Sequence, residues 1–257
     1  MTAKRKIGLT LIALVAICGL FAPYLAPFNP VSSGIDPLEG ASARHWLGTD
    51  PLGRDVLSRV IYGARISLTV GIGAAVIAAV IGVPVGLMAG YFRGRIDLVL
   101  VQIIDIFIAL PGLVLALIVT AMLGAKALNL ALVLGFVSSP TVARLVRGQA
   151  LQVRQTAYVE AARAAGGGPA WIIVRHVWPN IMRTVSAQFA ITVSYAIFTS
   201  ASLSFLGLGV PPPTPDWGGM VREGFEYLSV LPLLSLGPGA AVAVTVMAFY
   251  LIGSSVE

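Results

Sequence analysis

The chain has 257 residues, of which 57% are hydrophobic and 11% are charged, and it carries a formal net charge of +6. Soluble domains contain about 25% charged residues, and a water-soluble fold of this length could not bury so much apolar surface. We therefore expect an all-α integral membrane protein, because helices satisfy their own backbone hydrogen bonds in lipid. The basic residues are scattered at the ends of apolar runs instead of forming a stripe, which argues against nucleic-acid binding.

The first membrane span is predicted over residues 7–25. It follows a short basic stretch, residues 4–6, which places the N-terminus in the cytoplasm. The apolar run is longer than the core of a usual cleaved signal peptide, so we expect it to stay as a membrane anchor.

A polar external loop follows the first span and is predicted to end in an amphipathic helix. Asp50 is a good N-cap and Pro51 suits the first helical position. Asp55 and Arg59 have the i,i+4 spacing of a helical ion pair. This helix leads into the second span, so residues 1–65 form an N-terminal unit ahead of a core transmembrane domain, residues 66–257.

Five more apolar runs bring the expected number of spans to six. They cover residues 66–91, 98–123, 127–142, 182–208 and 228–253. The second span is rich in glycines that let neighbouring helices approach closely, such as Gly82, Gly86 and Gly90. Most of the 17 Lys and Arg residues fall in segments that are expected on the same side of the membrane as the N-terminus. This asymmetry predicts that both termini lie in the cytoplasm.

Asp105 is an acidic residue inside the third predicted span, where a charge is costly and marks a functional candidate. It lies about two turns beyond the basic turn at residues 92–97, near the cytoplasmic edge. We expect Asp105 to pair with an arginine of a neighbouring loop and to fix helix packing. A role in transport is the alternative.

The fifth predicted span carries a stripe of polar residues that recur every three or four positions and so share one helical face. The stripe consists of Gln188, Thr192, Tyr195, Thr199 and Ser202. Such a stripe faces either a water-filled pathway or another helix. We predict that it lines a translocation pathway, with helix packing as the alternative.

A polar stretch over residues 156–180 separates the fourth and fifth spans. Helix-forming residues run from Thr156 to Ala165, and then Gly166–Pro169 stop the helix. A second helical segment is predicted over residues 170–177. The result is a helix, a sharp turn and a helix with small exposed residues, a shape that fits a groove in another protein.

The same stretch resembles the EAA loop of ABC importer permeases. The match consists of Glu160-Ala161-Ala162, Gly166 and Pro179, whereas His176 and Trp178 depart from the family pattern. In that family the loop is the coupling helix that docks into the ATPase subunit. The resemblance therefore implies a set of ATPase-coupling residues, namely Glu160, Ala161, Ala162, Arg163, Gly166 and Pro179.

Two further stretches resemble the dipeptide/oligopeptide type of these permeases, LGTDPLGRDVLSRVIYGARISL at residues 47–68 and LSFLGLGVPPPTPDWGGMV at residues 203–221. The resemblance implies a multi-pass permease of the bacterial inner membrane, embedded in lipid, that works by alternating access. It also implies four kinds of partner outside this chain: a second homologous permease, two ATPase subunits, an external substrate-binding protein and the cargo. Similar permeases carry dipeptides, longer peptides, nickel or haem, and these cargoes stay open.

The chain lacks the Gly-rich phosphate loop of an ATPase, since none of its lysines follows a glycine. We expect no catalytic residues and no cofactor on this chain, with ATP and Mg on the partner subunits. His45 and His176 are isolated in the sequence, so no metal site is predicted. Two other classes of function remain, a stand-alone secondary transporter or channel and a membrane scaffold that only anchors a partner.

Overall fold

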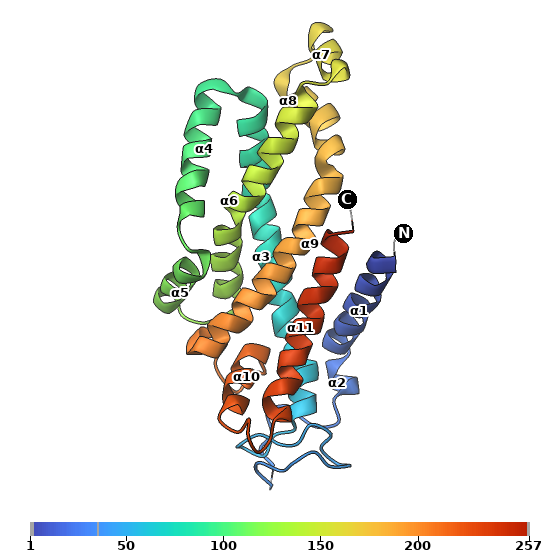
Figure 1. The fold of residues 1–257 in the computed structure, drawn as a ribbon, viewed down its shortest axis with the longest axis vertical. Helices are drawn as coiled ribbons and strands as arrows, with labels where there is room; N and C mark the ends of the chain where they lie inside the picture. The colour runs from blue at the N-terminus through green and yellow to red at the C-terminus, as the bar shows by residue number, and fades with distance from the viewer. Residues whose placement is uncertain (1–2, 35, 256–257) are drawn as a thin grey trace.

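The computed structural model describes residues 3–34 and 36–255, which form an elongated bundle of helices (Figure 1). In chain order the helices are α1 (Ala3–Leu20), α2 (Ala22–Leu25), α3 (Val56–Phe92), α4 (Gly94–Ala109), α5 (Gly112–Leu123), α6 (Ala127–Arg154), α7 (Ala157–Ala164), α8 (Pro169–Ile172), α9 (Trp178–Leu203), α10 (Trp217–Phe225) and α11 (Leu233–Gly253). Single π-helical turns precede and follow α9, at Ile173–Val177 and Ser204–Leu208.

Among the described residues, four helical stretches are long and apolar enough to cross a membrane: α3, α6, α11 and the run Pro169–Leu208 that contains α9. The bent pair α4–α5 makes a fifth if the two helices are one span. Helix α1 has 18 residues and begins with the basic residues at positions 4–6. The prediction of a helical membrane protein is therefore confirmed, while the number of six spans stays a prediction.

The centre of the bundle is the contact between α3 and α6, which the glycines of α3 make close. A Cβ atom at Gly82 would lie 2.6 Å from the carbonyl oxygen of Ser139, and one at Gly90 would lie 2.7 Å from that of Arg147. Side chains at these positions would force the two helices apart, as expected where small residues mediate packing in a membrane. The predicted role of these glycines is confirmed.

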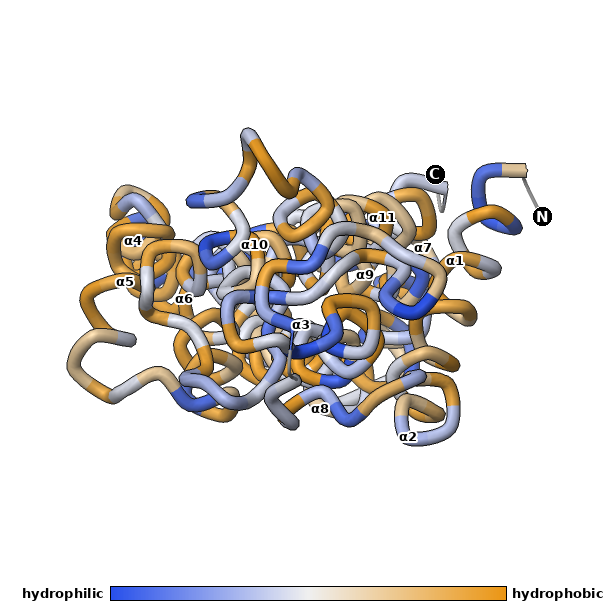
Figure 2. The backbone as a smooth tube through the Cα atoms, turned by 90° about the horizontal axis from the view of Figure 1, so that it is seen from below, coloured by the Kyte–Doolittle hydropathy of each residue, from blue (hydrophilic) through white to orange (hydrophobic). Residues whose placement is uncertain are grey.

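The third apolar run does not form one straight span, contrary to prediction. Helix α4 ends at Ala109, α5 starts at Gly112, and the two helix axes differ by 83°. Pro111 has no N–H to continue the helix, and the residue before a proline is pushed out of the helical region. Leu110 accordingly has an extended backbone, with φ −80° and ψ 133°. Figure 2, viewed along the bundle, shows that α4 and α5 are mostly hydrophobic.

The amphipathic helix that was expected to start at Pro51 and lead into the second span starts five residues later and is continuous with that span. Helix α3 starts only at Val56, and its N-cap is Asp55, whose carboxylate accepts the Ser58 N–H at 2.7 Å. Asp50 instead holds a turn, because its carboxylate accepts the backbone N–H of Arg54 at 3.0 Å. The residues after Val56 belong to the long membrane helix itself, so they form no separate surface helix.

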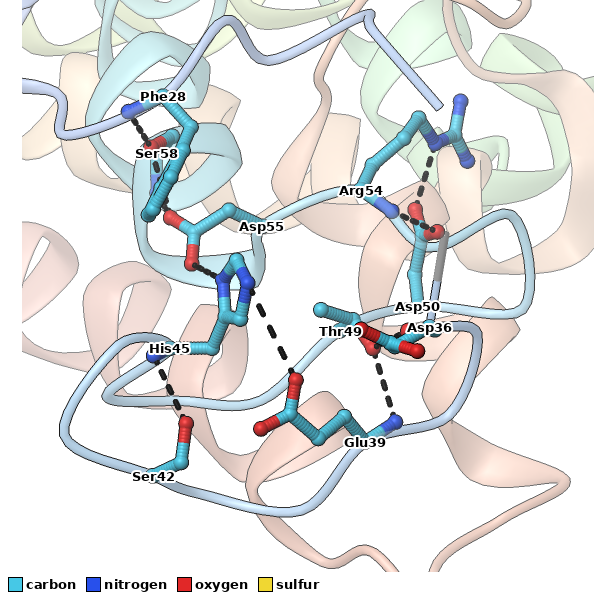
Figure 3. A network of polar contacts seen from close by, with 10 residues as sticks. All are labelled: Phe28, Asp36, Glu39, Ser42, His45, Thr49, Asp50, Arg54, Asp55 and Ser58. Carbon is cyan, nitrogen blue, oxygen red and sulfur yellow. Dashed lines mark hydrogen bonds and ion pairs between the residues drawn. The ribbon is translucent and has the colours of Figure 1, made fainter. Parts of the chain in front are cut away.

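A network of charged side chains replaces the predicted pair between Asp55 and Arg59, and Figure 3 shows the part of it around Asp50, Arg54 and His45. The Arg54 Nε lies 2.6 Å from the Asp50 carboxylate, and an Arg59 guanidinium nitrogen lies 3.1 Å from the same oxygen. Both arginines also reach Glu223 of α10, at 3.5 and 3.4 Å. Asp55 pairs with His45, whose Nδ1 lies 2.9 Å away. The network fixes the loop between α2 and α3 against α3 and α10.

The two ends of the bundle differ in construction. Helices α7 and α8 project at one end, whereas the loop between α2 and α3 and helix α10 lie at the opposite end (Figure 1). At that opposite end, Asp216 caps α10 by accepting the Gly219 N–H at 3.0 Å. Burial raises the pKa of the Asp216 carboxyl above its usual value. The end away from α7 therefore contains a buried, hydrogen-bonded carboxyl group.

Candidate coupling loop and translocation cavity

Helix α7 is fastened to the bundle by a single buried side chain. Val159 is fully buried in an apolar cluster with Ile172, Val177 and Ile181, which belong to α8, the first π-helical turn and α9. The same cluster includes Val146 of α6. The helix is therefore packed against the C-terminal end of α6 and the N-terminal end of α9.

The turn after α7 has the hydrogen bonds of a Schellman motif, which explains the glycines. The Gly167 N–H donates to the Ala162 carbonyl and the Gly166 N–H donates to the Arg163 carbonyl, both at 3.0 Å. Gly166 has a φ of +87°, a backbone conformation that is unfavourable for residues other than glycine. Pro169 then occupies the first turn of α8, where its missing N–H costs nothing. The predicted helix, turn and second helix are confirmed.

The free surface of α7 consists of small and charged residues. Glu160, Ala161 and Arg163 are exposed and Ala162 is half-buried. Two large aromatic side chains flank this surface, since Tyr158 is 43% exposed and Trp171 is 53% exposed. Tyrosine and tryptophan are enriched among the residues that contribute most to protein–protein binding. The surface suits a groove on another protein, with aromatic anchors beside a flat patch.

The other predicted coupling residues lie at the edges of this surface. Gly166 is exposed, and a Cβ placed there would meet no atom within 4 Å. Pro179 is also exposed but belongs to the first turn of α9, beyond α8 and the π-helical turn. Arg163 turns back toward the bundle, where its guanidinium lies 6.0 Å from the ring centre of Tyr91. Arg154 lies 5.7 Å from the same ring, so α6 and α7 meet at the end of α3.

A cavity of about 340 Å³ lies where α4 and α5 meet α6 and α9. Three residues of the predicted stripe line it, Gln188, Thr192 and Tyr195. Thr199 is buried with 3% exposure, and Ser202 borders a separate groove beside α10 and α11. The structure therefore brings three of the five stripe residues to one cavity and leaves the other two outside it.

Helix α6 contributes polar groups to the cavity that sequence reasoning missed. Ser138 and Thr141 line it, and the hydroxyl of Ser138 is buried without a hydrogen-bond partner in the described part of the chain. The signal was the sequence Ser138-Ser139-Pro140-Thr141, a polar interruption of an otherwise apolar span. An unsatisfied hydroxyl in a cavity is costly unless a bound molecule or water completes it.

The break between α4 and α5 forms another wall of the cavity, through Leu110 and Gly112. Non-helical backbone at membrane depth is tolerated where it lines a polar cavity or is buried in protein. Five lining residues carry hydroxyl or amide groups, the others are apolar side chains and one glycine, and none is charged. Such a surface can hydrogen-bond neutral polar groups, including peptide bonds, without holding them tightly by charge.

Comparison with known proteins places the chain among membrane transporters. Residues 82–256 match the family described as "Binding-protein-dependent transport system inner membrane component". The glutathione transport system permease protein GsiD of Pectobacterium atrosepticum is 39% identical over 252 residues, which are 97% of this chain and 83% of that protein. The GsiD of Escherichia coli O157:H7 is also 39% identical, over 248 residues that cover 96% of this chain and 82% of that protein.

Solved structures show the same fold. Two inward-facing crystal forms of the MetNI methionine ABC transporter contain a chain that superposes with a TM-score of 0.60. The sequence identities are 19% and 20%, the matches cover 77% and 78% of this chain, and they cover 96% and 97% of the other.

The helical fold, the projecting α7 and the match over most of the sequence define a transporter subunit that spans the bacterial inner membrane. The chain belongs to the family of binding-protein-dependent transport system inner membrane components, and it is a permease subunit of an ABC importer. The resemblance stated from the sequence motifs is confirmed.

Proposed function

We propose that this chain forms one half of the translocation pathway of an importer for dipeptides and oligopeptides, which works by alternating access. Helix α7 carries the proposal, because it is anchored through the fully buried Val159 and presents Glu160 and Ala161 outward. The GsiD relatives, which are glutathione permeases by name, support a short peptide cargo, since glutathione is a tripeptide. The neutral hydrogen-bonding lining of the cavity also suits peptide groups.

The proposed assembly contains a second homologous permease, two ATPase subunits and an external substrate-binding protein. ATP and Mg bind to the ATPase subunits, and this chain is no enzyme and binds no cofactor. The family description supports a binding protein as partner. The small exposed residues of α7 with Tyr158 and Trp171 beside them support an ATPase as the partner at this surface.

The proposed orientation has six spans with both chain ends in the cytoplasm. Helix α1 starts, and α11 ends, toward the end of the bundle that carries α7 (Figure 1). Basic residues are frequent on that side, among them Arg93, Arg95, Arg154 and Arg175. The positive-inside rule therefore supports a cytoplasmic α7 and an external charge network at the other end.

The proposed mechanism passes motion from α7 to the cavity through rigid elements. Closure of the ATPase pair on ATP displaces α7, and the Schellman turn keeps α7 and α8 moving together. Helix α9 continues from α8 through a π-helical turn and carries Gln188, Thr192 and Tyr195 on the cavity wall. Displacement at the cytoplasmic end therefore changes which side of the membrane the cavity opens to.

Two substitutions in the loop test this proposal in the reconstituted importer. Glu160→Lys reverses the exposed charge of α7, and Gly166→Arg forces a side chain onto a backbone with φ +87°. We expect each to abolish peptide uptake or to leave ATP hydrolysis running without it. Glu226→Lys, an equal charge change on an exposed residue at the opposite end, serves as the control. Normal transport by both loop variants would contradict the proposal.

A further inference from the structure

One ion pair joins α4 to α6 at the edge of the cavity. The guanidinium of Arg144 contacts the carboxylate of Asp105, and the two side chains are 52% and 50% exposed. Asp105 was expected to pair with an arginine of a loop, but Arg144 lies within the membrane helix α6. A half-exposed pair of full charges in this part of the molecule calls for a physical explanation.

A second ion pair between the same two helices shows what a purely structural clamp looks like here. The Arg147 guanidinium donates two hydrogen bonds to Asp97, at 2.6 and 2.9 Å. Its side chains are only 29% and 16% exposed. At about 1.5 Å per residue, Asp105 lies about 12 Å farther along α4 than Asp97, toward the middle of the bilayer. The helices are thus already clamped at their cytoplasmic ends.

The open face of the Asp105 pair is ill suited to lipid. A charged side chain in the hydrocarbon costs about 2.5–3.5 kcal/mol even on the lowest scales. Most of the large apolar side chains that α4 exposes, Val99, Ile103, Ile106 and Leu110, lie on a different face of the helix from Asp105, whereas Leu98 shares the face of Asp105 one turn before Gln102. The charges themselves therefore favour water or protein at the middle of this face.

The pair lies next to the cavity, on the side of α7. Asp105 is one helical turn from Ile108, and Arg144 is one turn from Thr141, and both of these neighbours line the cavity. Helix α4 starts, and α6 ends, at the end of the bundle that carries α7. The hydroxyl and amide groups of the cavity therefore continue, toward the cytoplasm, into one carboxylate and one guanidinium.

We propose that Asp105 and Arg144 form a charged site at the inner end of the cavity, which takes the terminal ammonium and carboxylate of a zwitterionic peptide. This inference rests on the proposed peptide cargo. The neutral cavity suits the peptide bonds, but it offers no counter-charge to the two ends of a short peptide. Solvent-exposed ion pairs are worth only about 0–1 kcal/mol, so a peptide can open this pair and exchange partners with it at small cost.

The test uses the complete importer, purified with its partner subunits and reconstituted in proteoliposomes, with labelled dialanine as the probe. Asp105→Asn and Arg144→Gln should each lower ATP-dependent uptake about tenfold, equal to about 1.4 kcal/mol of lost interaction. The exchange variant Asp105→Arg/Arg144→Asp restores an ion pair between α4 and α6 but reverses its direction. We expect it to leave uptake low.

The Asp97–Arg147 pair supplies the matched control. Uptake lost in Asp97→Asn should return in the exchange variant Asp97→Arg/Arg147→Asp, because that pair only holds the helices together.

A second measurement compares two peptides and needs no comparison of absolute rates between variants. Arg144→Gln should lose the preference of the unchanged importer for dialanine over dialanine amide, which has no terminal carboxylate, and a packing defect would slow both peptides equally.

Three results would count against this site. Restored uptake in the exchange variant of Asp105 and Arg144 would make the pair a structural clamp. Normal uptake in the two single variants, or an unchanged preference for dialanine over its amide, would contradict the site alone. Failure of the unchanged importer to take up dialanine would instead overturn the proposed cargo, and with it the ligand assigned to this pair.

Discussion

At the scale of single residues, the close approach of two membrane helices depends on the absence of side chains. Gly86 of α3 faces α6 so closely that a Cβ would lie 2.5 Å from the Ala143 carbonyl oxygen and 2.7 Å from the Cβ of Val146. Backbone atoms cannot give way as a flexible side chain can, so α3 and α6 would have to separate. In contrast, nothing lies within 4 Å of a Cβ at Gly148 of α6.

We expect Gly86→Ala to lower the stability of the protein in detergent by about 1–3 kcal/mol, the usual cost of overpacking. Gly148→Ala is the matched control, and it should leave stability unchanged or raise it by up to about 1 kcal/mol, because alanine favours helices. Thermal unfolding of both variants measures the difference. Equal midpoints for the two would contradict the packing described for α3 and α6.

At the scale of elements, helix α9 presents different surroundings to the residues of its polar stripe. Tyr195 is 46% exposed and lines the cavity, whereas Thr199 is 3% exposed and lies outside it. A cysteine at Tyr195 should therefore react readily with a water-soluble thiol reagent, and one at Thr199 should stay protected. The background for both variants is Cys18→Ser, which removes the natural free cysteine.

In the assembled importer, the labelling rates distinguish a stripe that lines the translocation pathway from one that packs against another helix. Fast labelling at Tyr195→Cys that changes when ATP is added indicates a pathway that opens and closes. Protection of Tyr195→Cys in every state of the transport cycle would show that this face of α9 packs against another helix. Equal labelling at Tyr195→Cys and Thr199→Cys would contradict the burial described here.

Most elements of this fold were predicted from the sequence. Long apolar runs indicate membrane helices, and glycine and proline indicate where helices end. The turn at Gly166 and the helices on either side of it were predicted on these grounds. The break at Pro111 was missed because the run on both sides of it is apolar, and hydropathy does not report an 83° bend.

The polar sites were harder to predict, because their partners are distant in the sequence. Arg59 was assigned to Asp55, its neighbour on a helix, but it pairs with Asp50 and Glu223 after the loop folds back. The cavity draws residues from four helices, and only those of α9 recur with a visible period. Local spacing identifies a helical face, whereas the tertiary fold decides what that face meets.

At the scale of the whole molecule, the two ends of the bundle suit different tasks. The end with Asp50, Arg54 and Arg59 is held by buried ion pairs. The end with α7 is held mainly by the apolar side chain of Val159 and the hydrogen-bonded turn at Gly166, and the face of α7 that points away from the bundle is exposed. A device that passes motion across a membrane needs this difference, because one end must respond to a partner while the other keeps its shape.

The proposed function requires that α7 lies in the cytoplasm against an ATPase subunit, and a cross-linking experiment can detect that contact. A single cysteine at Ala161, with Cys18→Ser as background, is placed in the full importer in inside-out membrane vesicles. We predict that it reacts with a membrane-impermeant thiol reagent in vesicles stripped of the ATPase. In vesicles that keep the ATPase, a bifunctional reagent with one thiol-reactive and one amine-reactive end should join it to a lysine of the ATPase. Labelling only in right-side-out vesicles, or no cross-link to the ATPase, would contradict the account.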